Sequence, residues 1–310
     1  MTEVNTRAAH AGAVARMSSL SASIDLLQGQ IATGKRIAAP ADDPVAFTHA
    51  AVLRRSEIAA AATRRGIDAA SSRLNATDIA LEGVTNLVQR ARELALQGST
   101  GTLSAGDRGI LAGEVGEIIS QFGALAESRG SDGERLFGGA AADRPAYAVG
   151  ADGVMAWQGA GHAPGVDVGG AGIASGIEGP DAFGTTNAAT NTATASMDLF
   201  AVLTSLAAAL RQPDAALRQT AMAANLDQLD GHVTRLATAR ALVGARGARL
   251  DTESQRLDKA SLGNQGDLSK LENLDMAEAI ARLQRLMTVL QATQGSFVKI
   301  TNLSLWDQLR

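Results

Sequence analysis

The stretch that comes nearest to a chemical site lies at residues 29–36 (GQIATGKR). It resembles a phosphate-binding loop, in which a glycine-rich turn follows a strand and a lysine is followed by Ser or Thr for Mg²⁺. Arg36 occupies the place where the hydroxyl residue is needed, and an amphipathic helical pattern precedes the glycines. We therefore interpret Gly34 as a helix stop, and Lys35 with Arg36 as a solvated basic pair.

The other residues that could do chemistry are too scattered to form a site. The glycine run at 169–172 lacks the third spaced glycine and the following helix of a dinucleotide loop, so a β-turn is the better interpretation. The chain has no cysteine, which excludes disulfides and thiol nucleophiles. None of the histidines has a metal-binding partner at helical spacing: His10, His49, His162 and His232. We predict no catalytic residue, no metal, no cofactor and no enzyme activity.

Composition points to long helices rather than to a compact sheet. Only 3% of the 310 residues are aromatic and six are proline, whereas strong helix formers such as Ala, Leu and Arg abound. The net charge of −4 argues against a nucleic-acid partner, which usually meets a basic excess. No run of eighteen apolar residues occurs, so no membrane insertion is expected, and the N-terminus lacks the pattern of a cleaved signal peptide.

Both ends of the chain carry apolar residues in alternating steps of three and four, the pattern of a coiled-coil seam. The N-terminal seam consists of Met17, Leu20, Ile24, Leu27 and Ile31. The C-terminal seam contains Met276, Ile280, Leu283, Met287, Leu290, Gln294, Phe297 and Thr301. An isolated helix of this length is marginal in water, so we expect the two ends to pair with each other and then with neighbouring copies.

A hinge is expected directly after the N-terminal helix. Proline disfavours helix in the residue before it, and an aspartate can cap the helix that follows. The hinge residues are Pro40, Asp42, Asp43 and Pro44.

Between the ends, two blocks of helical pattern flank a glycine-rich centre. The first block holds helices at about 44–97 and 107–129, and the second begins at Ser196 or Met197 and breaks at 263–266, before the last helix. Thirteen of the chain's 33 glycines fall within 138–184, with short β-branched pieces at 147–157 and 166–177. The first of the long inner seams consists of Ile67, Ala70, Leu74, Thr77, Leu81, Val84, Val88, Ala91 and Ala95.

The predicted fold is therefore mainly α, a long antiparallel bundle or coiled coil formed by the N- and C-terminal segments, with a small β-rich central insertion. The predicted parts are a terminal segment at 1–43 that pairs with 264–310, an inner helical domain made of 44–137 and 196–263, and an outer insertion at 138–195.

Several stretches together resemble the bacterial flagellin family. They are residues 27–37 (LQGQIATGKRI) with 40–44 (PADDP), residues 90–97 (RARELALQ), and residues 292–300 (ATQGSFVKI) with 303–309 (LSLWDQL). Pro44 after the aspartate pair and Trp306 near the C-terminus resemble the family's hook–filament junction subunits more than its filament subunits.

The resemblance implies a structural subunit of the flagellum, exported unfolded through the flagellar type III apparatus and located outside the cell. Its partners would be further copies of itself in a ring, hook-associated protein 1, flagellin and an export chaperone. The assembly interface would be the terminal seams: Met17, Leu20, Ile24, Leu27, Ile31, Ile280, Leu283, Met287, Leu290 and Phe297. A filament flagellin is one alternative, and a soluble coiled-coil signalling adaptor is another, because heptads alone do not separate these classes.

Overall fold

The computed structural model describes residues 2–141, 144–149, 155–168, 170–184 and 198–307. It divides into two compact units. Unit 1 contains Met1–Ala59 and Lys259–Arg310, and unit 2 contains Ala60–Asp258. Two long helices, α2 (Pro44–Ser99) and α6 (Ala215–Glu272), contribute residues to both units.

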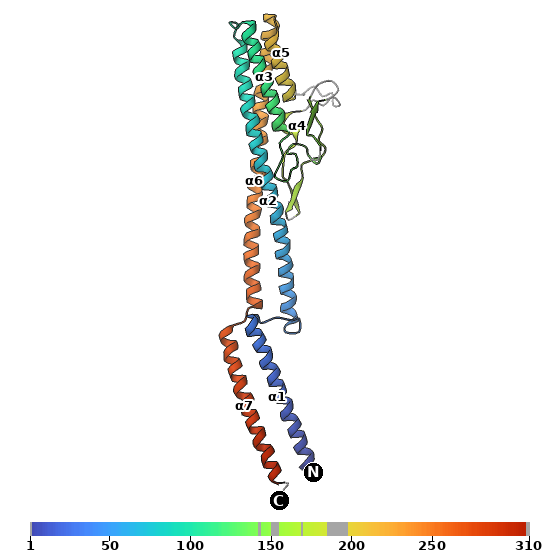
Figure 1. Ribbon diagram of the computed structural model, residues 1–310, viewed down its shortest axis with the longest axis vertical. Helices are drawn as coiled ribbons and strands as arrows, with labels where there is room; N and C mark the ends of the chain where they lie inside the picture. The colour runs from blue at the N-terminus through green and yellow to red at the C-terminus, as the bar shows by residue number, and fades with distance from the viewer. Residues whose placement is uncertain (1, 142–143, 150–154, 169, 185–197, 308–310) are drawn as a thin grey trace. The chain divides into compact units, whose positions relative to one another are not determined.

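Unit 1 is built around α1 (Thr2–Thr33) and α7 (Met276–Asp307), which pack side by side and run antiparallel (Figure 1). The first part of α2 and the last part of α6 complete the unit, and the side chain of Glu57 accepts hydrogen bonds from Ser261 and Asn264 between them. The predicted pairing of the terminal helices is thus present within the chain.

The helix break predicted at 263–266 is wrong, because α6 continues through both glycines to Glu272. A helical glycine costs only about 1 kcal/mol relative to alanine, which is too little to interrupt a long helix. Asn264, between the glycines, donates to Glu57 at 2.8 Å and so supports the helical path. The true start of α7 is set by Asp275, whose Oδ1 accepts from the amides of Ala277 and Glu278 at 3.0 and 3.1 Å.

Unit 2 is a bundle of α2, α3 (Ala105–Ala126), α5 (Leu199–Arg211) and α6 (Figure 1). α2 and α6 run antiparallel, since Arg92 pairs with Asp230 at 2.6 Å while Asp78 pairs with Arg240 at 2.8 Å. Every member of the predicted α2 seam, from Ile67 to Ala95, is buried. The periodicity therefore identified the core of this bundle.

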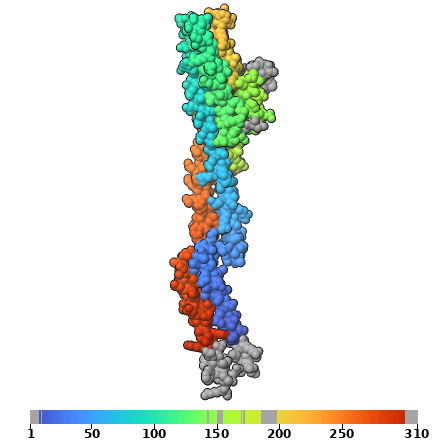
Figure 2. Space-filling model, in the orientation of Figure 1, coloured from blue at the N-terminus to red at the C-terminus, as the bar shows by residue number. Residues whose placement is uncertain are grey.

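The insertion folds as two small hairpins. Its described residues protrude from one side of the bundle (Figure 2). β1 (Tyr147–Val149) pairs with β2 (Met155–Trp157), and β3 (Gly165–Val168) pairs with β4 (Ala171–Ala174), both antiparallel. A short helix, α4 (Gly179–Phe183), follows. The aromatic side chains that join the insertion to α3 and α5 form one packed cluster of Phe122, Phe137, Tyr147, Phe183 and Phe200.

The mainly helical fold with a small β-rich insertion is confirmed. The predicted helix start at Ser196 or Met197 lies outside the described residues, and α5 is described from its N-cap, Asp198. The predicted division into five segments stays a prediction. Among the described residues, no helix is long and apolar enough to cross a membrane.

Candidate assembly interface

The predicted terminal seam is partly assembled within unit 1. Ile24 and Leu27 of α1 are each 7% exposed, and Ala279 of α7 is 4% exposed. Near the other end of the pair, the rings of His10 and Phe297 lie 4.7 Å apart. The remaining predicted residues that are half-buried are Met17, Leu20, Ile31, Leu283, Leu290 and Phe297.

Two predicted residues, Ile280 and Met287, lie beside the covered stripe of α7 rather than in it, and their packing against α1 after export stays a prediction. Each keeps 44% of its surface exposed. The covered stripe is displaced by one residue, so that Ala279 and Leu286 take the places that had been given to Ile280 and Met287. Whether Ile280 and Met287 belong to an interface between copies stays a prediction.

The apolar face of α7 is therefore wider than the part that α1 covers. Besides Ile280 and Met287, other large apolar side chains on α7 remain exposed: Met276, Val289 and Val298. Exposed apolar side chains become informative when they gather on one element. This face can bind another apolar helix surface, and it offers no group for catalysis.

The predicted hinge residues form a turn and a helix cap. The Asp42 amide donates to the Ala39 carbonyl at 3.1 Å, which closes a turn with Pro40 as its second residue. The Asp42 carboxylate accepts from the amides of Ala38 and Ala39, and these bonds lower its pKa. Asp43 accepts from the Ala46 amide at 3.0 Å and caps α2, with Pro44 as the first helical residue. Hinge motion itself stays a prediction.

For residues 29–36, the predicted helix stop is correct, but the predicted solvation of the basic pair is not. Gly34 has φ of +67°, as a glycine that ends a helix often has, so the helix stop is confirmed. The basic pair, however, is not simply solvated. Lys35 lies 3.3 Å from Glu272, and Arg36 pairs with Asp43 and donates to the Leu271 carbonyl. No signal in the sequence pairs these distant residues.

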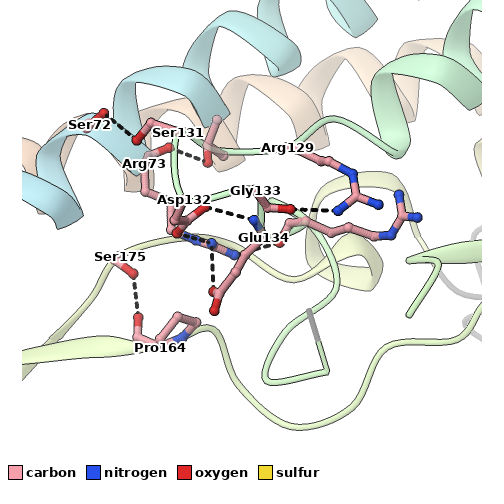
Figure 3. Close-up of polar contacts among 11 residues, drawn as sticks. Ser72, Arg73, Arg129, Ser131, Asp132, Gly133, Glu134, Pro164 and Ser175 are labelled. Carbon is pink, nitrogen blue, oxygen red and sulfur yellow. Dashed lines mark hydrogen bonds and ion pairs between the residues drawn. The ribbon is translucent and has the colours of Figure 1, made fainter. Parts of the chain in front are cut away.

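A second feature that sequence reasoning missed is a polar anchor for the insertion, shown in Figure 3. Arg73 of α2 is only 4% exposed. Its Nη2 donates to the Arg135 carbonyl at 2.6 Å, and its Nη1 lies 3.4 Å from the carboxylates of Asp132 and Glu134. Arg73 thereby fixes the 129–135 loop against α2.

Asp198 is a third feature that the sequence did not reveal. It is 1% exposed and accepts from the Phe200 amide at 3.1 Å as the N-cap of α5. Burial raises its pKa to about 7, although hydrogen bonds from the Phe200 and Leu199 amides act in the opposite direction. Burial, followed by the charges of Asp198 and Glu127, raises the pKa of the neighbouring Tyr147.

The described residues contain no group of three or more His, Asp or Glu side chains that could hold a metal ion. The histidines considered above as possible metal ligands lie apart from one another. His10 packs on Phe297, His162 pairs with Glu178 at 3.3 Å, and His232 is buried in α6. These arrangements are those of a helical structural protein whose paired ends expose apolar surface.

Comparisons with known proteins agree with this class. Residues 4–142 match the bacterial flagellin N-terminal helical region, and residues 226–306 match the bacterial flagellin C-terminal helical region. The chain belongs to the bacterial flagellin family, which consists of structural proteins of the flagellum. The family resemblance read from the motifs at both ends is confirmed.

Relatives of known name align over nearly the whole chain. Flagellar hook-associated protein 3 of Escherichia coli (strain K12) is 28% identical over 299 residues, which are 90% of each protein. The Salmonella typhimurium protein of the same name is 26% identical over 292 residues, again 90% of each. A flagellin of Listeria monocytogenes is 26% identical over 274 residues, 86% of this chain and 84% of the flagellin.

Solved structures share the fold. The flagellar hook-associated protein-3 of Legionella pneumophila superposes with a TM-score of 0.63 at 14% identity, covering 71% of this chain and 98% of that one. A flagellar junction protein from the same organism gives a TM-score of 0.56 at 14% identity, covering 65% and 98%. At such identities the likeness concerns the fold alone.

Proposed function

We propose that this chain is the subunit that joins hook-associated protein 1 to the flagellin filament. The observation that carries the proposal is the alignment with hook-associated protein 3 from two organisms, which spans 90% of each protein. Pro44 behind the aspartate pair supports the same assignment. The subunit acts as a building block of a ring, outside the cell.

Assembly proceeds through the terminal helices after export in an unfolded state. α1 and α7 pair along the stripe that holds Ile24, Leu27 and Ala279, and the exposed face of α7 then packs against neighbouring copies. Within the proposed interface, Ile280 and Met287 contact a second copy rather than α1. The chain's partners are further copies of itself, hook-associated protein 1 and flagellin, with an export chaperone before assembly.

Immunogold electron microscopy of intact flagella tests the location. The antibody is raised against the purified chain and affinity-selected on the insertion peptide 155–168. The matched control is a strain that lacks the gene. We expect a single band between hook and filament. A band elsewhere on the hook side would refute the assignment to the hook–filament junction.

A filament flagellin is the second candidate, because the Listeria flagellin aligns with 86% of this chain. It predicts gold particles along the whole filament and loss of the filament when the gene is deleted. The absence of label from flagella would instead favour a soluble coiled-coil signalling adaptor.

A further inference from the structure

A nearly buried carboxylate lies where the helices of unit 1 are connected. Glu272, the last residue of α6, is 8% exposed. One oxygen lies 2.5 Å from Nη2 of Arg54 on α2, and the other lies 3.3 Å from Nζ of Lys35, in the connection between α1 and α2. Three segments of the chain therefore meet at one charge.

Backbone hydrogen bonds join the same segments directly. The Arg36 amide donates to the Glu272 carbonyl at 2.7 Å, and the Leu274 amide donates to the Gly34 carbonyl at 3.0 Å. Between these two bonds Lys35 and Asn273 form an antiparallel bridge. The α1–α2 connection and the α6–α7 connection are thus paired like two short strands, directly before the terminal helices begin to pack.

We propose that Glu272 is the positioning residue that holds these two connections in register, so that α1 and α7 enter the assembly as a pair with one fixed alignment. The inference rests on the proposed function for its biological role. The contacts of Glu272 with Arg54 and Lys35, called the clamp below, are a property of the single chain. Without it, one residue of slip between the connections would move α1 against α7 and misalign the two seams.

Burial makes this charge effective as a clamp. The Glu272 side chain is 11% exposed, whereas the side chains of Lys35 and Arg54 keep 50% and 47% of their surface exposed. The buried partner is therefore the carboxylate, and two cations compensate its charge, whereas a fully exposed pair contributes little. Burial by itself raises the pKa of Glu272, but Arg54 and Lys35 outweigh it and lower the pKa below its ordinary value near 4.5. Other charged groups near the two connections are Arg36 and Asp43, which pair with each other at 3.4 Å, and Asp42, Lys270 and Asp275.

Amide hydrogen exchange of the full-length protein measures the clamp. The amides of Arg36 and Leu274 report on the paired connections, because each donates across them. We expect Glu272→Gln to accelerate their exchange by at least about tenfold, since the loss of the nearly buried charge shared by Arg54 and Lys35 opens the structure locally. Lys35→Met, which leaves the Arg54 contact in place, should give a smaller acceleration and covers the case in which Glu272→Gln fails to fold.

The matched control is Asp267→Asn. Asp267 is also an acidic residue of α6 and pairs with Lys270 at 3.2 Å, but both side chains are more than half exposed. Exchange at Arg36 and Leu274 should stay at the wild-type rate in this variant. An equal acceleration in Asp267→Asn, or none in Glu272→Gln, would overturn the proposal.

The pH profile separates a clamp from a general loss of packing. A carboxylate whose folded pKa is lowered stabilises above its ordinary pKa, and the stabilisation is lost as the pH falls through the folded value. After correction for intrinsic exchange, wild-type protection at the two amides should fall below about pH 4.5. Glu272→Gln should show a smaller fall, which is the part left by Asp43 beside Arg36, whose pKa is also lowered. These measurements need no flagellum, so a failed clamp and a failed junction assignment are distinguishable.

Discussion

The buried carboxylate of Asp198 should make unit 2 less stable at alkaline pH. In an unfolded chain this group ionises near its ordinary pKa of 3.8, whereas in the folded protein its pKa is about 7. A raised carboxyl pKa means that the folded state binds the proton more tightly. The resulting stabilisation is therefore present at low pH and is lost as the pH rises through 7.

The size of the effect follows from this pKa. Between pH 6.0 and pH 8.5, a group with a folded pKa of about 7 and an unfolded pKa of 3.8 loses about 1.4 kcal/mol of stabilisation. Asp198→Asn removes the titration but keeps an amide oxygen that can accept from the Phe200 amide, because Asn caps helices as well as Asp does. The variant should therefore lack this part of the pH dependence.

Urea denaturation at the two pH values provides the assay. Of the two tryptophans, Trp157 lies in the insertion, so a Trp306→Phe background makes the indole fluorescence specific to unit 2. The control is Asp214→Asn, because Asp214 caps α6 at an exposed position through the amides of Ala216 and Leu217. We expect the unfolding free energy of the wild type to change more between the two pH values than that of Asp198→Asn. Equal changes in the two proteins would refute the reasoning.

Three further outcomes are expected. Leu283→Asp puts a charge into the half-buried seam of α7 and should abolish incorporation into flagella, seen by immunogold labelling, while urea melts of unit 2 stay unchanged within about 0.5 kcal/mol. Arg73→Met should weaken the anchor of the insertion by about 1–3 kcal/mol and speed Glu-specific proteolysis at Glu134, whereas Arg92→Met, which removes a half-exposed ion pair with Asp230 on another part of α2, should not. Phe122→Ala should cost about 3–5 kcal/mol in urea melts, because Phe122 is fully buried between Phe183 and Phe200.

The sequence predicted best those elements whose apolar residues are buried by their own chain. On α2 one apolar stripe runs without interruption from Ile67 to Ala95, so the periodicity points to Leu81, Val84 and Val88, and all three are fully buried. On α7 two neighbouring stripes are apolar. Periodicity cannot decide which of them faces α1, and this is why Ile280 and Met287 were placed one residue away from the covered positions.

The polar features were beyond sequence reasoning for a different reason. Arg36 and Leu271 are 235 residues apart, and nothing local to either residue indicates the partner. Asp198 has the sequence context of an ordinary helix cap, and its unusual pKa arises from burial in the folded protein. Gly263 and Gly266 predicted a helix break that does not occur. Both lie at open positions of α6, where the helix tolerates a glycine.

The two units differ in how completely they bury their apolar residues, and this difference bears on assembly. In unit 2 the central side chains of α2 have no exposed surface, whereas the best-covered side chains of α1 keep 7% and most of its seam is only half-buried. Full burial of an aliphatic side chain contributes about 1.5–3 kcal/mol, so half-buried positions gain correspondingly less. Ordering each residue of α1 and α7 costs about 1–2 kcal/mol in backbone entropy whatever its burial. The terminal helices therefore stand to gain most from contacts with further copies, and a clamp that sets their register beforehand would lower the entropy cost of those contacts.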